Sequence, residues 1–256
     1  MSESRREALR RKQQAQARAK RTQRIVIVGA IVLAVVVLGV FGTIFFSQLN
    51  KGGGGTASAA IPPNATADRS GIVVNPGKAA QGVPKVELFF DYQCPVCKQF
   101  ETQFGTTLDD MATKGEIQLI YRTMTFLDNN LRNDSSLKAG IAAACADNAG
   151  AYSAYHNAIF AGQPTNEGTG YTTQQLRVDF AGTAGITGDK LTGFQQCYDS
   201  RTTQSFVEGT NEKAAADGVN STPTIMVNGT KLDNNTIFTQ GADAFRQTVL
   251  TTKGNG

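Results

Sequence analysis

Residues 86–101 read VELFFDYQCPVCKQFE, and this stretch decides the fold. Its first half belongs to a β-forming run over 83–92 in which apolar residues alternate, which indicates a buried strand. A helical pattern over 95–111 follows at once, and a second alternating run covers 116–124. Strand, helix and strand at this spacing predict a βαβ unit with a parallel strand pair.

Two cysteines, Cys94 and Cys97, stand at the junction between the first strand and the helix. Residues three apart in a helical turn have Cα atoms about 5–5.5 Å apart, which a disulfide can close. We expect Cys94 to be exposed at the helix N-terminus, where unpaired N–H groups and the helix dipole favour a thiolate. Pro95 suits the first helical turn because it has no N–H to leave unpaired.

This spacing predicts disulfide exchange through a mixed disulfide at Cys94, with Cys97 as the recessed partner. A purely structural disulfide and half of a zinc site are the alternatives. The sequence has no second Cys-x-x-Cys and only one histidine to complete a tetrahedral zinc site. We therefore expect neither a metal nor a cofactor.

The rest of the globular part is predicted to be a helical block followed by a hairpin. Residues 135–216 carry helical patterns and almost no strand signal. A strand at 224–227, an Asn-Gly turn and a short strand at 230–232 come next, and a last helix is expected near 242–251. The expected domain covers 71–256, with an all-helical insertion at about 127–217.

The N-terminal quarter has a different composition. Residues 1–24 contain nine basic and two acidic residues, so the remainder has a formal net charge of −3 although the whole chain carries +4. Residues 25–46 hold no charge and would form a helix of about 33 Å, enough to cross a hydrocarbon core of about 30 Å. Residues 47–70, with four consecutive glycines and a Pro-Pro pair, predict a flexible linker.

We interpret Ile25 to Phe46 as an uncleaved transmembrane anchor. A cleaved signal peptide would have an apolar region of roughly 7–15 residues with a cleavage site close behind it. A buried core helix is the other alternative. The basic flank predicts a cytoplasmic N-terminus and an extracytoplasmic domain on a single-pass protein of the cell membrane. Contact with anionic lipid explains the basic tail more simply than nucleic-acid binding, which we do not expect.

Two segments together resemble the DsbA-like thiol:disulfide oxidoreductases. VELFFDYQCPVCKQFE is similar to their active-site segment, and GVNSTPT at 218–224, followed by IMVNG, is similar to their cis-proline loop and next strand. YHNAIFAGQP at 155–164 is similar to a segment of their inserted helices. The resemblance covers most of 83–252 and implies an α/β thioredoxin-like fold with a helical insertion.

The resemblance also implies roles for Thr222 and Pro223, which would face the cysteines and present backbone edges to an extended substrate. It implies that this loop keeps the reactive disulfide from binding metal. Without the resemblance, Pro223 is an ordinary proline at a strand start, because only about 5–6% of X–Pro bonds are cis.

Several positions near the cysteines depart from the family pattern or need an interpretation of their own. Well-known DsbA enzymes carry a histidine between the cysteines, where this chain has Pro95 and Val96. Thioredoxins carry a buried acid six residues before the first cysteine, where this chain has Leu88. Asp91 is the nearer acid, either a proton relay for Cys97 or a solvated carboxylate at the strand end. Lys98 is expected to be a solvated helix residue.

The remaining cysteines, Cys145 and Cys197, lie in the helical block. In an oxidising compartment an even number of remaining cysteines predicts a structural disulfide, with two buried free thiols as the alternative. His156, the only histidine, is expected to be a packed or half-exposed helix residue rather than a catalytic one.

The predicted function is the introduction of disulfides into unfolded or folding exported proteins that contain cysteines. For reoxidation the family implies a quinone-linked membrane partner of the DsbB or vitamin-K-epoxide-reductase type. The alternatives are a reductase or isomerase supplied by a membrane electron donor, and a non-catalytic binding or chaperone module. We expect a monomer, because the linker is too short to be a dimerisation domain.

Overall fold

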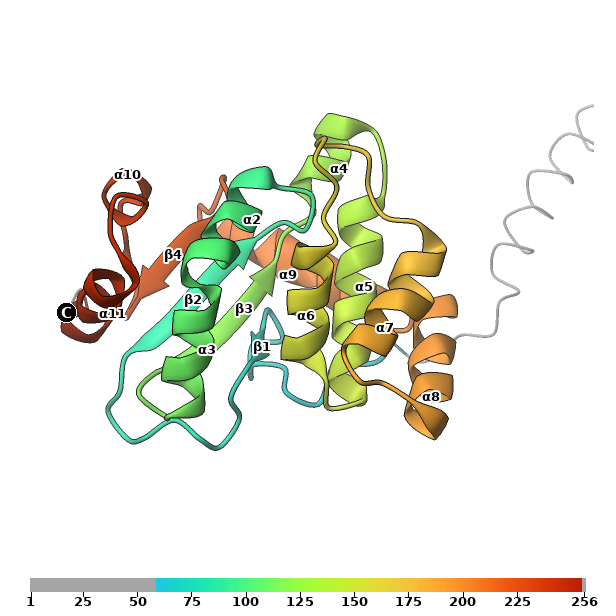
Figure 1. The fold of residues 1–256 in the computed structure, drawn as a ribbon, viewed down its shortest axis with the longest axis horizontal. Helices are drawn as coiled ribbons and strands as arrows, with labels where there is room; N and C mark the ends of the chain where they lie inside the picture. Colours follow the sequence, from blue (N-terminus) through green and yellow to red (C-terminus); the bar gives the residue numbers. More distant parts are fainter. Residues whose placement is uncertain (1–58, 255–256) are drawn as a thin grey trace, which may run out of the picture. The chain divides into compact units, whose positions relative to one another are not determined.

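The computed structural model describes residues 59–254, so the predicted tail and membrane span lie outside the described part. Within residues 59–254, no helix combines the length and the apolar character that a membrane span requires. The described chain forms a sheet flanked by helices, with a block of helices beside it (Figure 1).

The sheet has five strands in the order β1-β3-β2-β4-β5. Strand β2 (Lys85–Phe90) runs parallel to β3 (Gln118–Thr123) and antiparallel to β4 (Thr224–Val227). The parallel pair confirms the predicted βαβ unit. Two-residue strands close both edges, β1 (Ile72–Val73) beside β3 and β5 (Thr230–Lys231) beside β4.

Strand β2 is the centre of the fold because both of its faces are covered. Val86, Leu88 and Phe90 point into the main core, whereas Phe89 belongs to a smaller cluster on the other face. A strand buried on both faces carries apolar residues at consecutive positions, as Leu88, Phe89 and Phe90 do. Glu87 shares the second face and is neutralised there by Arg122, 2.6 Å away.

One long helical stretch follows the cysteines. It comprises α2 (Pro95–Phe100), the π-helical turn η1 (Glu101–Gly105) and α3 (Thr106–Thr113). Figure 1 shows α2 and α3 in front of β2 and β3. The sequence predicts the helix but not the π-helical turn, a widening that is frequent at functional sites.

The helical block between β3 and β4 confirms the predicted insertion. It contains α4 (Phe126–Leu131), α5 (Ser135–Asn148), α6 (Tyr152–Ala161), the π-helical turn η2 (Gln175–Asp179), α7 (Phe180–Thr183), α8 (Gly188–Asp199) and α9 (Gln204–Ala216). Cys145 of α5 and Cys197 of α8 form a disulfide with Cα atoms 5.8 Å apart, as predicted. Figure 1 shows α5, α6, α7 and α8 gathered on one side of the sheet.

The chain ends as the sequence predicts, with a hairpin and a helix. Asn228 has a φ of 52° and Gly229 a φ of 80°, so the Asn-Gly turn between β4 and β5 uses two left-handed residues. The short helix α10 (Asn234–Ile237) and the last helix α11 (Ala242–Thr251) follow. Phe245 of α11 packs against Phe104, with ring centroids 4.3 Å apart.

The predicted linker requires a correction, because its last part is folded. The backbone N–H of Ala60 donates to the carbonyl of Thr202, and Ala65 forms a β-bridge with Ile72. Asn64 donates from its backbone and its side chain to the Asp147 carboxylate, at 2.9 and 2.7 Å. Composition indicated a spacer here, but these long-range hydrogen bonds to α5 and to the turn after α8 order the segment.

Candidate active site

The two cysteines stand where the sequence predicts, at the junction of β2 and α2. Cys94 is the N-cap residue of α2, and Cys97 lies one turn into the helix. Both are free thiols in this structure. The bond between Thr222 and Pro223 is cis, and the Thr222 carbonyl oxygen lies 3.7 Å from the Cys94 sulfur. Two segments therefore meet at one sulfur atom, although Cys94 and Thr222 are 128 residues apart.

Cys94 is less exposed than we expected for a helix terminus, with 7% of its surface accessible. The Thr222 carbonyl covers one side of the sulfur. The Gln163 amide donates to the Cys94 backbone carbonyl at 3.0 Å. The cis-proline loop thus contacts the sulfur of Cys94, and the helical insertion holds its backbone.

The environment of Cys94 favours its thiolate. The Cys97 thiol, acting as a hydrogen-bond donor, is the main reason that the pKa of Cys94 falls from 9.0 to about 6, against the opposing effect of burial. Backbone N–H groups of Cys97 and Val96 and the Thr222 hydroxyl contribute in the same direction. At neutral pH, Cys94 is therefore mostly ionised.

Cys97 has the opposite character. It is 1% exposed, and its burial, followed by the neighbouring Cys94, raises its pKa well above the ordinary value. The thiol remains protonated at neutral pH and donates to the Cys94 sulfur. One cysteine of the pair is thus suited to attack or leave, and the other to store a proton.

Asp91 is not the solvated carboxylate of the second sequence interpretation, because it is 0% exposed. Its carboxylate accepts hydrogen bonds from the Ser136 hydroxyl at 2.6 Å and from the Gln93 backbone at 2.8 Å. Burial raises the pKa of Asp91 to about 7, and the negative charge of Asp128 acts in the same direction. The backbone N–H of Asp91 also faces the Cys97 sulfur.

The pKa of Asp91 makes a prediction about stability. Between its ordinary value of 3.8 and about 7, the folded protein binds more protons at this site than the unfolded chain does. Its contribution to stability is therefore lost as the pH rises through that window. We expect Asp91→Asn to raise the melting temperature relative to wild type more at pH 8 than at pH 5.

Thermal unfolding at the two pH values measures this difference. Glu167→Gln is the matched control, because Glu167 is an exposed carboxyl in the loop after α6. The same offset between Asp91→Asn and wild type at both pH values would contradict the assignment.

The sequence did not reveal the polar groups that hold the cysteine loop from the helical insertion. The Gln163 side chain donates to the carbonyls of Tyr92 and Cys94, at 2.7 and 3.0 Å. The Tyr171 hydroxyl donates to the Tyr92 carbonyl at 2.6 Å. Gln163 is the penultimate residue of the segment YHNAIFAGQP, so that resemblance was the available signal, whereas nothing in the sequence marks Tyr171.

Two further side chains were also not anticipated. Gln93 is 3% exposed and donates to the Asp128 carboxylate at 2.8 Å, which joins the cysteine loop to α4. Asn234 donates to the Pro223 carbonyl at 2.8 Å and supports the cis-proline loop from α10. Lys98, expected in solvent, instead donates from its ammonium to the Gln163 carbonyl at 2.8 Å.

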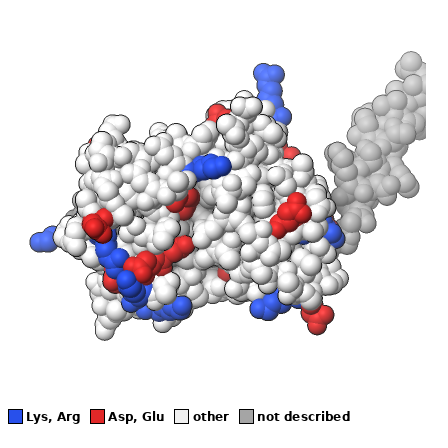
Figure 2. All heavy atoms as spheres, viewed as in Figure 1, with Lys and Arg blue, Asp and Glu red and all other residues white. Residues whose placement is uncertain are grey.

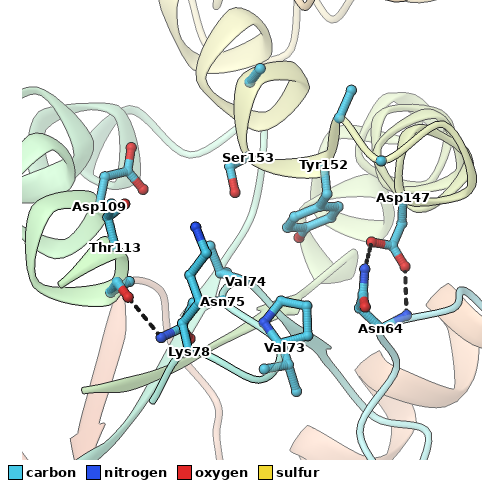
Figure 3. A pocket seen from close by; sticks show the side chains of 15 residues that line it. Asn64, Val73, Val74, Asn75, Lys78, Asp109, Thr113, Asp147, Tyr152 and Ser153 are labelled. Carbon is cyan, nitrogen blue, oxygen red and sulfur yellow. Dashed lines mark hydrogen bonds between the residues drawn. The ribbon is translucent and has the colours of Figure 1, made fainter. Parts of the chain in front are cut away.

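One pocket of the described residues lies away from this site. The pocket in Figure 3 has a volume of about 510 Å³ and is lined by residues of the segment 64–78, of α3 and of the α5–α6 turn. Neither cysteine and no residue of the cis-proline loop lines it. This pocket is therefore not part of the cysteine site.

Comparison with known families decides the affiliation. A family model described as thioredoxin matches residues 78–242, which is well over half of the chain. The chain belongs to the thioredoxin family. A search of curated proteins found no significant match.

Solved structures that share the fold of this thioredoxin-family protein include proteins named as DsbA, MdbA and BdbD. MdbA from Actinomyces oris is 24% identical, with a TM-score of 0.62 over 75% of this chain and 92% of that chain. DsbA from Mycobacterium tuberculosis in its reduced form is 23% identical, with a TM-score of 0.53 over 71% and 98%. BdbD from Bacillus subtilis is 24% identical, with a TM-score of 0.53 over 67% and 88%. These likenesses establish the fold.

Proposed function

We propose that this thioredoxin-family protein is an extracytoplasmic thiol:disulfide oxidoreductase that introduces disulfides into exported proteins. The observation that carries the proposal is the asymmetry of the cysteine pair beside the cis-proline loop. Cys94 is stabilised as a thiolate next to the Thr222 carbonyl, and Cys97 is a buried thiol. The proteins named DsbA and MdbA that share the fold support this assignment.

Oxidation of a substrate proceeds in two exchange steps. In the oxidised enzyme, a substrate thiolate attacks the Cys94 sulfur and breaks its bond to Cys97, which leaves as a thiolate and takes up a proton. A second substrate thiolate then attacks the substrate sulfur of this mixed disulfide and releases the Cys94 thiolate. The substrate loses two electrons to form its disulfide, and the enzyme gains them as two reduced cysteines.

The direction follows from the stability of the reduced pair. A thiolate with a depressed pKa is a good leaving group, and stabilising the reduced form makes the enzyme a stronger oxidant. Asp91 is the proposed proton relay for Cys97, since it is a wholly buried acid three residues before Cys94 and burial raises its pKa to about 7. Each cycle leaves the enzyme reduced, so a reoxidant is required, for which we propose a quinone-linked membrane protein.

The proposed setting is the outer face of the cell membrane, with residues 25–46 as anchor and 1–24 in the cytoplasm. It is supported by the uncharged run of 22 residues and its basic flank. The disulfide between Cys145 and Cys197 adds support, because such bonds persist in oxidising compartments.

The test is the reduction potential of the full chain in glutathione buffers, with reduced unfolded ribonuclease offered as substrate. We expect a potential of about −120 to −180 mV together with net oxidation of ribonuclease. A potential near −270 mV without net oxidation would identify a reductase instead. The absence of any reversible couple would leave only the non-catalytic binding module.

A substitution of Val96 is expected to make this protein a stronger oxidant. Its side chain is 45% exposed, so a substitution there does not disturb the core. Val96→His places an imidazole between the cysteines, where its positive charge favours the thiolate. We expect the pKa of Cys94 to fall further and the potential to rise by about 30 mV for each pKa unit.

Val96→Gln is the matched control, since it is polar and has no titratable group. Absorbance of the thiolate at 240 nm and the glutathione equilibrium measure the two quantities. Equal values for the two variants would show that charge at position 96 does not reach Cys94.

A further inference from the structure

His156 has no part in the exchange steps, yet its surroundings connect it to both sides of the cysteine pair. The side chain lies in α6 and is 0% exposed, which settles the choice between packed and half-exposed. The ring stacks on Tyr121 with centroids 4.4 Å apart and meets the edge of Phe90 at 4.8 Å. Both ring nitrogens therefore face protein groups rather than water.

The first nitrogen reaches the strand end before Cys94. His156 Nδ1 lies 3.1 Å from the Tyr92 hydroxyl, and Tyr92 is also 0% exposed. Tyr92 stands two residues before Cys94, and its carbonyl accepts from Gln163 and Tyr171. His156 thus holds the side chain of the same residue whose backbone the insertion already holds.

The second nitrogen reaches the helix after Cys97. His156 Nε2 lies 3.3 Å from Glu101 Oε1, and the Glu101 side chain is 8% exposed. Among the described residues, neither of these two atoms makes a hydrogen bond, and the 3.3 Å approach to each other is a polar contact only. A buried polar atom without a hydrogen bond costs about 1–3 kcal/mol, which gives each of these atoms a reason to face the other.

The helix is shaped to admit this carboxylate. Glu101 begins the π-helical turn η1, four residues after Cys97. A Cβ at Gly105 would stand 2.6 Å from Glu101 Oε2, so a larger residue there would displace the carboxylate. The π-helical turn and the glycine together allow the Glu101 carboxylate to lie next to His156 of α6.

We propose that His156 is a positioning residue of the redox centre, which ties the strand end before Cys94 and the helix after Cys97 to α6 through Tyr92 and Glu101. The inference rests on the proposed function, because the two tied segments flank the reactive pair. With both segments fixed, Cys94 stays at the helix start with its sulfur under the Thr222 carbonyl. The imidazole that relatives carry between their cysteines acts on the sulfur directly, whereas His156 acts through Tyr92.

Tyr92→Phe is the decisive variant, because it removes one hydroxyl and leaves the aromatic packing. We expect the midpoint of the Cys94 thiolate titration at 240 nm to rise by about half a unit, a threefold change. The equilibrium with glutathione should move about threefold toward the weaker oxidant. Tyr121→Phe is the matched control, since the Tyr121 hydroxyl is buried in the same cluster without a hydrogen-bond partner.

Two substitutions at position 156 separate the contact of His156 with Tyr92 from its contact with Glu101. His156→Ala removes both contacts, whereas His156→Asn keeps an acceptor near the place of Nδ1. We expect the alanine variant to show the full shift in titration and the asparagine variant to recover at least half of it.

An unchanged titration in Tyr92→Phe, whatever its melting temperature, would overturn the positioning role and leave His156 as core packing. An equal shift in Tyr121→Phe would overturn it as well, because the loss of any hydroxyl in this cluster would then change the titration of Cys94 in the same way. If wild type has no reversible couple with glutathione, the proposed function fails, yet the thiolate titration still decides whether Tyr92 and His156 position Cys94.

Discussion

Cys94→Ser is expected to abolish disulfide exchange, and Cys97→Ser is expected to stop it at the mixed disulfide. A serine hydroxyl forms no disulfide, so turnover of ribonuclease should fall to the uncatalysed rate, at least about a thousandfold. In Cys97→Ser the Cys94 thiolate can still attack a disulfide in oxidised, scrambled ribonuclease, which releases one ribonuclease thiolate and forms a mixed disulfide. Because Cys97 is missing and cannot resolve it, this mixed disulfide should accumulate, and non-reducing electrophoresis detects it as a new covalent species.

Substitutions of Cys97 by serine and by alanine also report on the pKa of Cys94. The Cys97 thiol is the largest cause of the lowered value, so Cys97→Ser keeps a hydroxyl donor at that place and Cys97→Ala removes it. We expect the serine variant to titrate closer to about 6 and the alanine variant closer to 9.0. Residual turnover in Cys94→Ser comparable to wild type would show that exchange does not depend on the cysteine pair.

Much of the fold follows from local patterns in the sequence. Strand β2 and helix α11 are visible because alternation and helical periodicity persist over their full length. Strand β1 was not predicted, because two residues carry no periodic signal and pair only through contact with β3. The sequence also did not predict that residues 59–70 are folded, for the same reason. Asn64 is held there by a hydrogen bond to Asp147, 83 residues away.

The same distinction between local patterns and long-range contacts holds for the site. Cys94 and Cys97 form a short motif, so their chemistry and spacing were visible in the sequence, whereas the roles of Thr222 and Pro223 came only from the resemblance to the DsbA-like family. Ser136, Gln163 and Tyr171 act on the cysteine loop from the helical insertion, and only the fold brings them there. Asp91 lies between the two cases. Its position was visible, but the burial that decides its protonation depends on α4 and α5 covering the strand end.

Removal of the disulfide between Cys145 and Cys197 is expected to be the largest loss of stability available without touching the redox pair. The bond closes a loop of 52 residues and joins α5 to α8 across the insertion. The chain-entropy model assigns such a loop about 4 kcal/mol. We expect Cys145→Ala with Cys197→Ala to lower the free energy of unfolding in urea by about this amount.

The control is the wild-type protein with Cys94 and Cys97 oxidised or reduced, since that bond closes only a short loop and should change stability less. Below its unfolding transition the double alanine variant should still oxidise ribonuclease, because the sulfur atoms of Cys145 and Cys197 contact Thr203, Asn148 and Thr202 of the insertion and not the reactive pair. A stability loss under about 1 kcal/mol would mean that packing of α5 against α8 already restricts the chain and that the bond adds little. Loss of exchange in a folded variant would instead show that the insertion must be held rigid for Gln163 and Tyr171 to keep Cys94 in place.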